Sequence, residues 1–446
     1  TGLTIGDDYF SDDAGNIKKF LTSVTSTNTT PTVKGVTTMD GSDTSTGKPS
    51  STYEATSGAY VIGYRDTSNS NYITMVAGTW SSGTVTWGTP FVVASHASRT
   101  EPSLDAGDGY VSLFYGLADN SQASLRIFSI SGTTFTITTA QTVYAGATAG
   151  EKVAWVPSSA FSSSPYDPVC GIVCCIYSHS GTGSEATYVR SYTIKVSNGN
   201  DEGKTTEEAI LATNAHIDKS DIIADPDNAK VIYSTFDGSD GDVGKSIVIG
   251  FGGTYDSPTD TVGTGVDFSG SDDAPEVLST YDPDNNKVIV VWRNNASSTY
   301  TIKGAIGTIN AATNAIAFSG ETTLISSGAN YMNQIDIIYD EDANKIILYH
   351  NNGSDHMIYK IITCDGSSLT IADGDTITTD NCRWFTNSAS FGAGKGVLLA
   401  TENNNNSNYV SYTTLYFSET TTYTKTNSQY IGKALSATAL ELKDQD

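Results

Sequence analysis

The chain has 446 residues and a formal net charge of −25, from 24 Lys and Arg against 49 Asp and Glu. A protein this acidic repels phosphate backbones and anionic lipid heads, so we expect no nucleic-acid partner and no membrane-surface role. No run of about 18 apolar residues occurs, and we expect no membrane insertion. The 42 Gly, the 25 Tyr and the low content of charged residues (16%) favour strands and turns over amphipathic helices.

Residues 1–50 are predicted to form an amino-terminal arm. The chain starts at Thr1, with no initiator Met or signal peptide, so we expect it to be a portion of a longer protein. Residues 32–38 resemble the outer strand of a blade whose earlier strands are missing. We predict that they complete the final blade and close a ring; the alternative is an arm lying on the outside. Residues 11–15 hold the Ser-X-Asp-X-Gly core of a sialidase Asp-box, but the rest of the box is missing and it occurs once.

Three later stretches repeat one pattern, an Asp-containing turn followed by Lys and an apolar strand. They begin at Asp225, Asp282 and Asp340, with spacings of 57 and 58 residues. A recurrence of this length indicates an array of like units. A unit of four short strands cannot bury both faces of its own sheet, so it must stack on copies of itself. The closed form of that stacking is a β-propeller.

The unit at 275–332 shows the expected order of elements. A first strand (276–281) leads through a turn of Asp, Pro and Asn (282–286), which favours chain reversal. A nearly continuous apolar strand (287–292), a polar loop and an alternating strand (300–306) follow, and residues 315–324 end the unit. The unit from Ser51 repeats this order, because Tyr72 lies seven residues after Arg65 just as Tyr300 lies seven after Arg293.

We predict an all-β fold, a β-propeller of seven four-stranded blades in residues 51–430, with six or eight blades left open. The outer strand of the last unit, at 421–426, is the weakest. Residues 431–446 are predicted to be the start of a further strand-rich module or a C-terminal tail. The seven units span 51–99, 100–151, 152–219, 220–274, 275–332, 333–383 and 384–430.

The sequence of the repeats resembles that of repeat proteins from marine tailed phages, such as cyanophages. The resemblance lies in residues 279–293, which form a Tyr-Asp turn and a Lys-Val strand ending in Trp292 and Arg293, and in the Gly-Thr strand at 303–308. Residues 430–434 also resemble the Tyr-Ile-Gly-X-Ala opening of the module that follows such repeats. The resemblance covers most of residues 51–442. It implies a virion structural protein of the tail-fibre, tail-tip or nozzle type, but it carries no catalytic residues.

The Asp-rich turns place oxygen atoms at alternate positions, as calcium loops do. At Asp282, Asp284 and Asn286 a Lys and a strand follow in place of the expected Gly and Glu, so plain hairpin turns are favoured. The five histidines show no metal-ligand spacing, and His350 and His356 are predicted to flank a solvated loop. We therefore expect no metal site and no cofactor. The histidines are His96, His179, His216, His350 and His356.

Other candidate residues receive structural interpretations. Arg65 and Arg293 are predicted to pair or stack between blades, with lining of a central channel as the alternative. The cysteines Cys170, Cys174, Cys175, Cys364 and Cys382 are interpreted as buried small hydrophobes, with one bridge conceivable in the last pair. The Asn-X-Ser/Thr triplets at Asn28, Asn295, Asn352 and Asn405 are expected by chance at this Asn and Thr content.

The sequence thus predicts a non-enzymatic virion or extracellular protein, with no catalytic residues and an unknown binding site. Expected partners are other virion proteins or further copies of the chain, and a host surface glycan or protein. The loops at 294–299 and 402–408 are the candidate contact surfaces. Two rivals remain. A secreted polysaccharide-acting propeller enzyme would show a deep acidic cleft at the channel mouth. A cellular extracellular adhesin or filament subunit would need a leader or sorting signal in its parent gene, and capsid and terminase genes nearby would exclude it.

Overall fold

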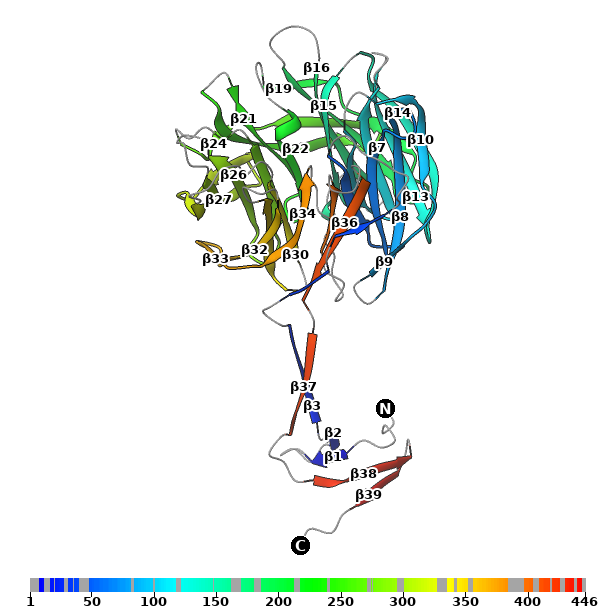
Figure 1. Cartoon of the computed structure of the whole chain (residues 1–446), viewed down its shortest axis with the longest axis vertical. Helices are drawn as coiled ribbons and strands as arrows, with labels where there is room; N and C mark the ends of the chain where they lie inside the picture. The colour runs from blue at the N-terminus through cyan, green and yellow to red at the C-terminus, as the bar shows by residue number, and fades with distance from the viewer. Residues whose placement is uncertain are drawn as a thin grey trace. The chain divides into compact units, whose positions relative to one another are not determined.

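In the computed structural model the chain forms two compact units, Val33–Tyr416 and the paired chain ends Thr1–Thr32 with Phe417–Asp446. The larger unit is a seven-bladed all-β propeller, as predicted. Its sheets follow one another round the molecule in chain order (Figure 1). The structure describes residues 8–11, 17–19, 21–27, 31–34, 36–39, 48–81, 84–98, 101–117, 122–146, 148–161, 170–179, 186–211, 217–238, 241–270, 274, 276–294, 301–326, 335–340, 343–351, 356–383, 397–403, 409–417, 419–425, 430–436 and 439–442.

The first six blades are antiparallel meanders, each starting with an inner strand. Blades 1 to 3 comprise β6 (Ser50–Glu54), β7 (Ala59–Asp66), β8 (Tyr72–Ser81), β9 (Thr84–Trp87) and β10 (Phe91–Ala97); β11 (Ser103–Gly107), β12 (Tyr110–Gly116), β13 (Ala123–Ser131) and β14 (Thr134–Tyr144); β15 (Thr148–Val156), β16 (Cys170–His179), β17 (Thr187–Lys195), β18 (Asp201–Lys204) and β19 (Glu208–Leu211). Blades 4 to 6 comprise β20 (Asp221–Asp225), β21 (Lys230–Asp237), β22 (Val243–Thr254), β23 (Ser257–Val262) and β24 (Val266–Asp267); β25 (Glu276–Asp282), β26 (Lys287–Asn294), β27 (Thr301–Asn310), β28 (Ala315–Phe318) and β29 (Thr322–Ser326); β30 (Ile335–Asp340), β31 (Lys345–Asn351), β32 (His356–Cys364), β33 (Leu369–Ala372) and β34 (Thr376–Arg383).

The first hairpin of a blade is built by its turn residues. In blades 1, 4 and 5 four residues separate the paired strands, and the last of them has positive φ: 70° at Gly58, 51° at Ala229 and 50° at Asn286. Gly and Asn tolerate this left-handed conformation better than other residues do. An acid at the end of the inner strand then caps the turn, as Asp225 does by accepting the N–H of Asp227 at 3.0 Å.

The core lies between blades. Trp292 of β26 is fully buried against Phe268 of the preceding blade, with ring centroids 5.1 Å apart. Similar clusters join neighbouring blades from blade 7 through blade 1 to blade 6. The middle of β26 is apolar from Val288 to Trp292 and fully buried, because both faces of the sheet are covered there, as this run predicted.

The seventh blade uses both ends of the propeller sequence. Its strands β35 (Val397–Asn403) and β36 (Tyr409–Tyr416) come from the end, and β4 (Thr32–Val33) and β5 (Thr37–Thr38) come from the beginning. Thr37 and Thr38 lie opposite Tyr412 and Ser411. The ring is therefore closed by residues within 32–38. The blade ends at 416 rather than 430, and the sequence boundary at 151–152 falls inside β15.

The chain ends form their own strands. In a four-stranded sheet, β1 (Asp8–Ser11) and β2 (Ile17–Lys19) join β38 (Tyr430–Ser436) and β39 (Ala439–Leu442). β3 (Leu21–Thr27) pairs with β37 (Glu419–Lys425). Residues 421–425, which belong to the stretch 421–426 expected as the outer strand of the last blade, therefore pair within this second unit instead. No helix among the described residues is long and apolar enough to cross a membrane.

Candidate functional site

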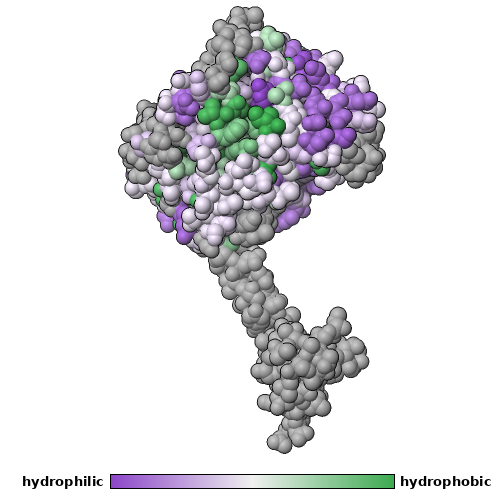
Figure 2. All heavy atoms as spheres, turned by 90° about the vertical axis from the view of Figure 1, so that its right-hand side faces the viewer, coloured by the Kyte–Doolittle hydropathy of each residue, from purple (hydrophilic) through white to green (hydrophobic). Residues whose placement is uncertain are grey.

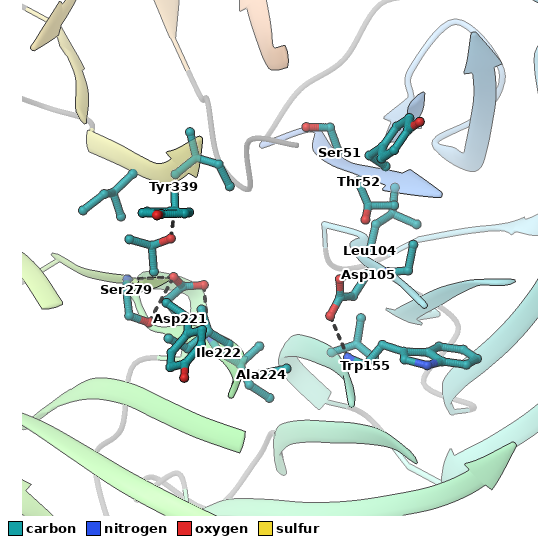
Figure 3. A pocket seen from close by; sticks show the side chains of 18 of the residues that line it. Ser51, Thr52, Leu104, Asp105, Trp155, Asp221, Ile222, Ala224, Ser279 and Tyr339 are labelled. Atoms are coloured by element: carbon teal, nitrogen blue, oxygen red, sulfur yellow. Dashed lines mark hydrogen bonds between the residues drawn. The ribbon is translucent and has the colours of Figure 1, made fainter. Parts of the chain in front are cut away.

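The inner strands of blades 1 to 6 enclose a cavity of about 370 Å³ in the middle of the propeller (Figure 3). Its walls combine apolar, aromatic and hydroxyl side chains with three carboxyl groups, those of Asp105, Asp221 and Asp336. The cavity reaches the end of the ring where the hairpin turns lie, because Pro226 and Pro283 line it. A concave site with mixed apolar and polar walls is the usual form of a small-ligand site.

Hydroxyl side chains join the inner strands of neighbouring blades. Ser50 Oγ accepts the N–H of Leu104 at 3.1 Å, and Ser103 Oγ accepts the N–H of Val153 at 3.0 Å. Thr280 Oγ1 accepts the N–H of Tyr339 at 3.1 Å. These bonds satisfy edge N–H groups that no ladder reaches, and they tie each blade to the next.

Two of the carboxyl groups join blades in the same way. Asp105 Oδ2 accepts the N–H of Trp155 at 2.6 Å, while its Oδ1 accepts the N–H of Ala106 at 2.8 Å. Asp221 Oδ2 accepts the N–H of Ser279 at 2.8 Å, and its Oδ1 accepts the N–H of Ile222 at 2.9 Å. Both carboxyl groups are therefore held rigidly on opposite sides of the cavity (Figure 3).

Burial makes ionisation of these groups costly. The pKa of Asp105 is raised to about 7, mainly by burial and also by the charge of Asp221, while the two backbone hydrogen bonds oppose the rise. Burial also raises the pKa of Asp221, although Lys152 and the hydrogen bonds from Ser279 oppose it. No Lys, Arg or His is among the described residues that line the cavity, so the only cation found to act on these two carboxyl groups, Lys152, lies outside the lining.

The two ends of the cavity differ. At the turn end, the partly exposed rings of Tyr53 and Tyr281 line it, and the Tyr281 hydroxyl donates to Asp227 Oδ2 at 2.6 Å. At the end where the inner strands begin, Lys48 Nζ lies 3.5 Å from Glu276 Oε1. This ion pair joins blades 1 and 5, which are not neighbours in the ring.

The repeated Asp residues serve the turns. Asp282 accepts the N–H of Asn285 at 3.2 Å and its Nδ2 at 2.8 Å, and Asp340 accepts the N–H of Ala343 at 3.1 Å. The hairpin interpretation is therefore confirmed in blades 5 and 6. Arg65 and Arg293 lie on second strands, β7 and β26, and do not line the cavity.

His350 is buried rather than part of a solvated loop. Its Nδ1 lies 3.2 Å from the carbonyl oxygen of Asn351, and burial lowers its pKa to about 4. Strand β31 extends to Asn351 and so includes this histidine. The polar residues that follow it had suggested that the strand ends earlier. The residues between Asn351 and His356 lie outside those described.

His179 joins blades 2 and 3. Its ring is stacked between those of Tyr144 and Tyr188, each with centroids 3.9 Å away. Its Nε2 lies 3.5 Å from Glu207 Oε2, which also accepts the hydroxyl of Tyr177. Tyr144 ends β14, whereas the other residues belong to blade 3, so the stack is an inter-blade contact. These residues come from separate segments of the sequence, so no local motif could have predicted the stack.

Four cysteines have free thiols and are buried, as predicted: Cys170, Cys174, Cys175 and Cys364. Burial raises the pKa of all four, so they act as small apolar groups rather than nucleophiles. The conceivable bridge from Cys364 is not formed.

Several predicted features lie wholly or mostly outside the described residues. These are the four Asn-X-Ser/Thr triplets at Asn28, Asn295, Asn352 and Asn405, the Asp-box core at 11–15, His216, and the candidate contact loops at 294–299 and 402–408.

The described outer surface is mostly polar. Figure 2 shows one group of apolar residues on the side that carries β10 and β14 in Figure 1. On those strands Val92 and Ile137 have exposed fractions of 41% and 43%. Tyr255 and Ile371 are the other exposed large apolar residues in the described part of the chain. The outer face thus carries only scattered exposed apolar residues, whereas the central cavity brings acidic, hydroxyl and aromatic residues together.

Asp105 and Asp221 were not singled out from the sequence, because neither belongs to the repeated turn. The sequence does show one related pattern: Ser50, Ser103 and Ser279 are small polar residues within strands that also contain apolar residues. That pattern predicts a strand with one polar face, but not which atoms meet across blades.

No protein-family model matches the sequence, and no curated protein matches it. Among solved structures, the fucose-specific lectin from Aleuria aurantia is 10% identical, with a TM-score of 0.44 over 75% of this chain and 97% of that one. AofleA from Arthrobotrys oligospora is 12% identical, with a TM-score of 0.42 over 81% and 92%. The GH93 α-L-arabinofuranosidase of Fusarium graminearum is 10% identical, with a TM-score of 0.41 over 69% and 89%. These similarities concern the fold and say nothing of ligand or reaction.

Proposed function

We propose that the chain is a non-enzymatic structural and binding protein of a phage virion, of the tail-fibre or tail-tip type. Its propeller would present the central cavity and the surrounding loops to a host surface glycan or to another virion subunit. The virion assignment comes from the resemblance of the repeats, whereas the non-enzymatic role comes from the geometry of the cavity.

The non-enzymatic role is supported by the hydrogen bonds of Asp105 and Asp221. A glycosidase needs one carboxyl group that transfers a proton and a second that acts as base or nucleophile. Here every carboxylate oxygen of the two residues accepts a backbone N–H, and one N–H on each comes from the next blade. The pair thus ties neighbouring blades together, which favours recognition over turnover.

Immunogold electron microscopy of purified virions tests the proposal. Antibodies raised against the full chain are expected to label a fixed position on the tail or its fibres, and an unrelated propeller antibody serves as the control. Detection of the chain only in the soluble fraction, or a gene neighbourhood without capsid and terminase genes, would contradict a virion role.

A polysaccharide-acting enzyme is the second candidate, and one observation favours it. Asp105 has a pKa of about 7 and lies across the cavity from Asp221, which is a pairing that hydrolases use. Incubation with bacterial and algal polysaccharides, followed by a reducing-end assay, separates the two. Turnover that disappears in both Asp105→Asn and Asp221→Asn would establish the enzyme and refute the non-enzymatic proposal.

A further inference from the structure

We infer that the central cavity binds a sugar residue that carries an ammonium group. This inference rests on the non-enzymatic binding role proposed above, and it specifies the chemistry of the ligand. It is carried by the charge of the walls, by the arrangement of their polar atoms and by the rings at the turn end.

The walls are electrostatically one-sided. They bring Asp105, Asp221 and Asp336 to one cavity of about 370 Å³ without a lining cation. Two lysines outside the lining have acidic partners: Lys152 favours the ionised form of Asp221, and Lys48 pairs with Glu276. An anionic ligand, such as a uronic acid or a phosphate, would be repelled, whereas an ammonium group would relieve the mutual repulsion of the carboxylates.

The carboxylates keep capacity for a ligand although they tie the blades together. A carboxylate has about four lone-pair positions. At Asp105 two of them are used, by Trp155 and Ala106. The backbone bonds therefore fix the orientation of the carboxylate in advance and leave positions for charge-assisted hydrogen bonds to a ligand.

The remaining polar atoms suit a sugar better than a lysine side chain. Hydroxyls of Ser51, Thr52 and Thr280 belong to two different blades around the cavity, whereas the hydroxyl of Ser279 donates to Asp221 Oδ2 at 3.3 Å. Thr280 Oγ1 acts as an acceptor toward Tyr339, so its own O–H is not used in that bond. A polyol ring has hydroxyls on all its edges and can match such groups, whereas a lysine has one polar end on an apolar stem.

Aromatic rings complete the site. Tyr53 and Tyr281 line the turn end and are partly exposed. The face of a Tyr ring attracts cations and stacks on the apolar face of sugar rings. The cavity thus joins negative charge to aromatic surface, a combination that selects a cationic organic ligand over a bare metal ion.

Isothermal titration calorimetry with three matched probes at pH 7.5, above the pKa of about 7 of Asp105, tests this inference. Methyl β-glucosaminide, methyl β-glucoside and methyl β-glucuronide share one ring and carry a positive, zero and negative charge. We expect the glucosaminide to bind at least about tenfold more tightly than the glucoside, and the glucuronide to bind most weakly. Equal affinities, a preference for the glucuronide, or no binding of any probe would overturn the inference.

Variants locate the binding. Asp105→Asn and Asp221→Asn should each weaken glucosaminide binding about tenfold, and Asp373→Asn, whose side chain is 98% exposed, serves as the matched control without effect. The probe series on the unaltered chain decides the question if either variant fails to fold. Nα-acetyl-lysine methylamide binding as tightly as the glucosaminide would refute the sugar assignment.

The same samples separate failure of this inference from failure of the proposed function. Release of methanol from the bound glucosaminide would overturn the non-enzymatic role, whatever the affinity. Recovery of intact probe together with absence of binding would overturn the ligand inference alone.

Discussion

The replacement Asp105→Asn is expected to change how the stability of the propeller depends on pH. The unfolded chain ionises this carboxyl group near its ordinary pKa of 3.8, whereas the folded chain holds its pKa at about 7. Below pH 4 the group is protonated in both states and costs nothing. Between pH 4 and 7 the unfolded state releases its proton first, so the free energy of unfolding falls as the pH rises.

The size of the effect follows from the two pKa values. A rise from 3.8 to about 7 corresponds to about 4 kcal/mol at pH 8. Because the side chain of Asp105 keeps part of its surface in contact with the cavity, screening reduces this to about 2 to 4 kcal/mol. The Asn variant carries no charge, so its stability relative to the unaltered chain should improve by that amount between pH 4 and pH 8.

Urea-induced unfolding of both proteins from pH 4 to pH 8, followed by tryptophan fluorescence, measures this difference. Taking the difference cancels the titration of the other carboxyl groups. Asp373→Asn is the control, since Lys360 lowers the pKa of that exposed carboxyl and its effect on the pH dependence of stability therefore lies below about pH 4. A stability difference between Asp105→Asn and the unaltered chain that stays constant across this range would refute the reasoning.

Three further changes probe the packing and the turns. Trp292→Ala should lower the free energy of unfolding by about 3 to 5 kcal/mol, because it empties a fully buried site between blades 4 and 5; an unchanged melting temperature would contradict that packing. Ala229→Gly should raise the free energy of unfolding by about 1 kcal/mol, since Ala229 has a φ of 51° at the position where blade 1 has Gly58. Thermal unfolding measures the gain, and a loss would show that the left-handed conformation is not strained. Asp282→Ala should lower it by about 1 to 3 kcal/mol by leaving the N–H of Asn285 without its acceptor, and a matched Asp284→Ala change at an exposed position of the same turn should cost far less in the same assay.

The sequence by itself determined the units of the fold. The spacing of Asp225, Asp282 and Asp340 indicated blades, and the apolar run from Val288 to Trp292 indicated a strand covered on both sides. These features are local: a turn depends on residues a few positions apart, and a buried strand depends on its own composition. For this reason the seven blades and the order of their strands were predictable.

Only the tertiary structure decided which side chains meet in the cavity. Asp105 and Asp221 belong to different blades, and their meeting depends on the curvature with which the sheets stack into a ring. The same holds for Thr37 and Thr38, which pair with Tyr412 and Ser411 from the other end of the propeller sequence. Periodicity along a chain specifies the face on which a residue lies. The distance between residues of separate blades is set by the geometry of closure, which local patterns do not contain.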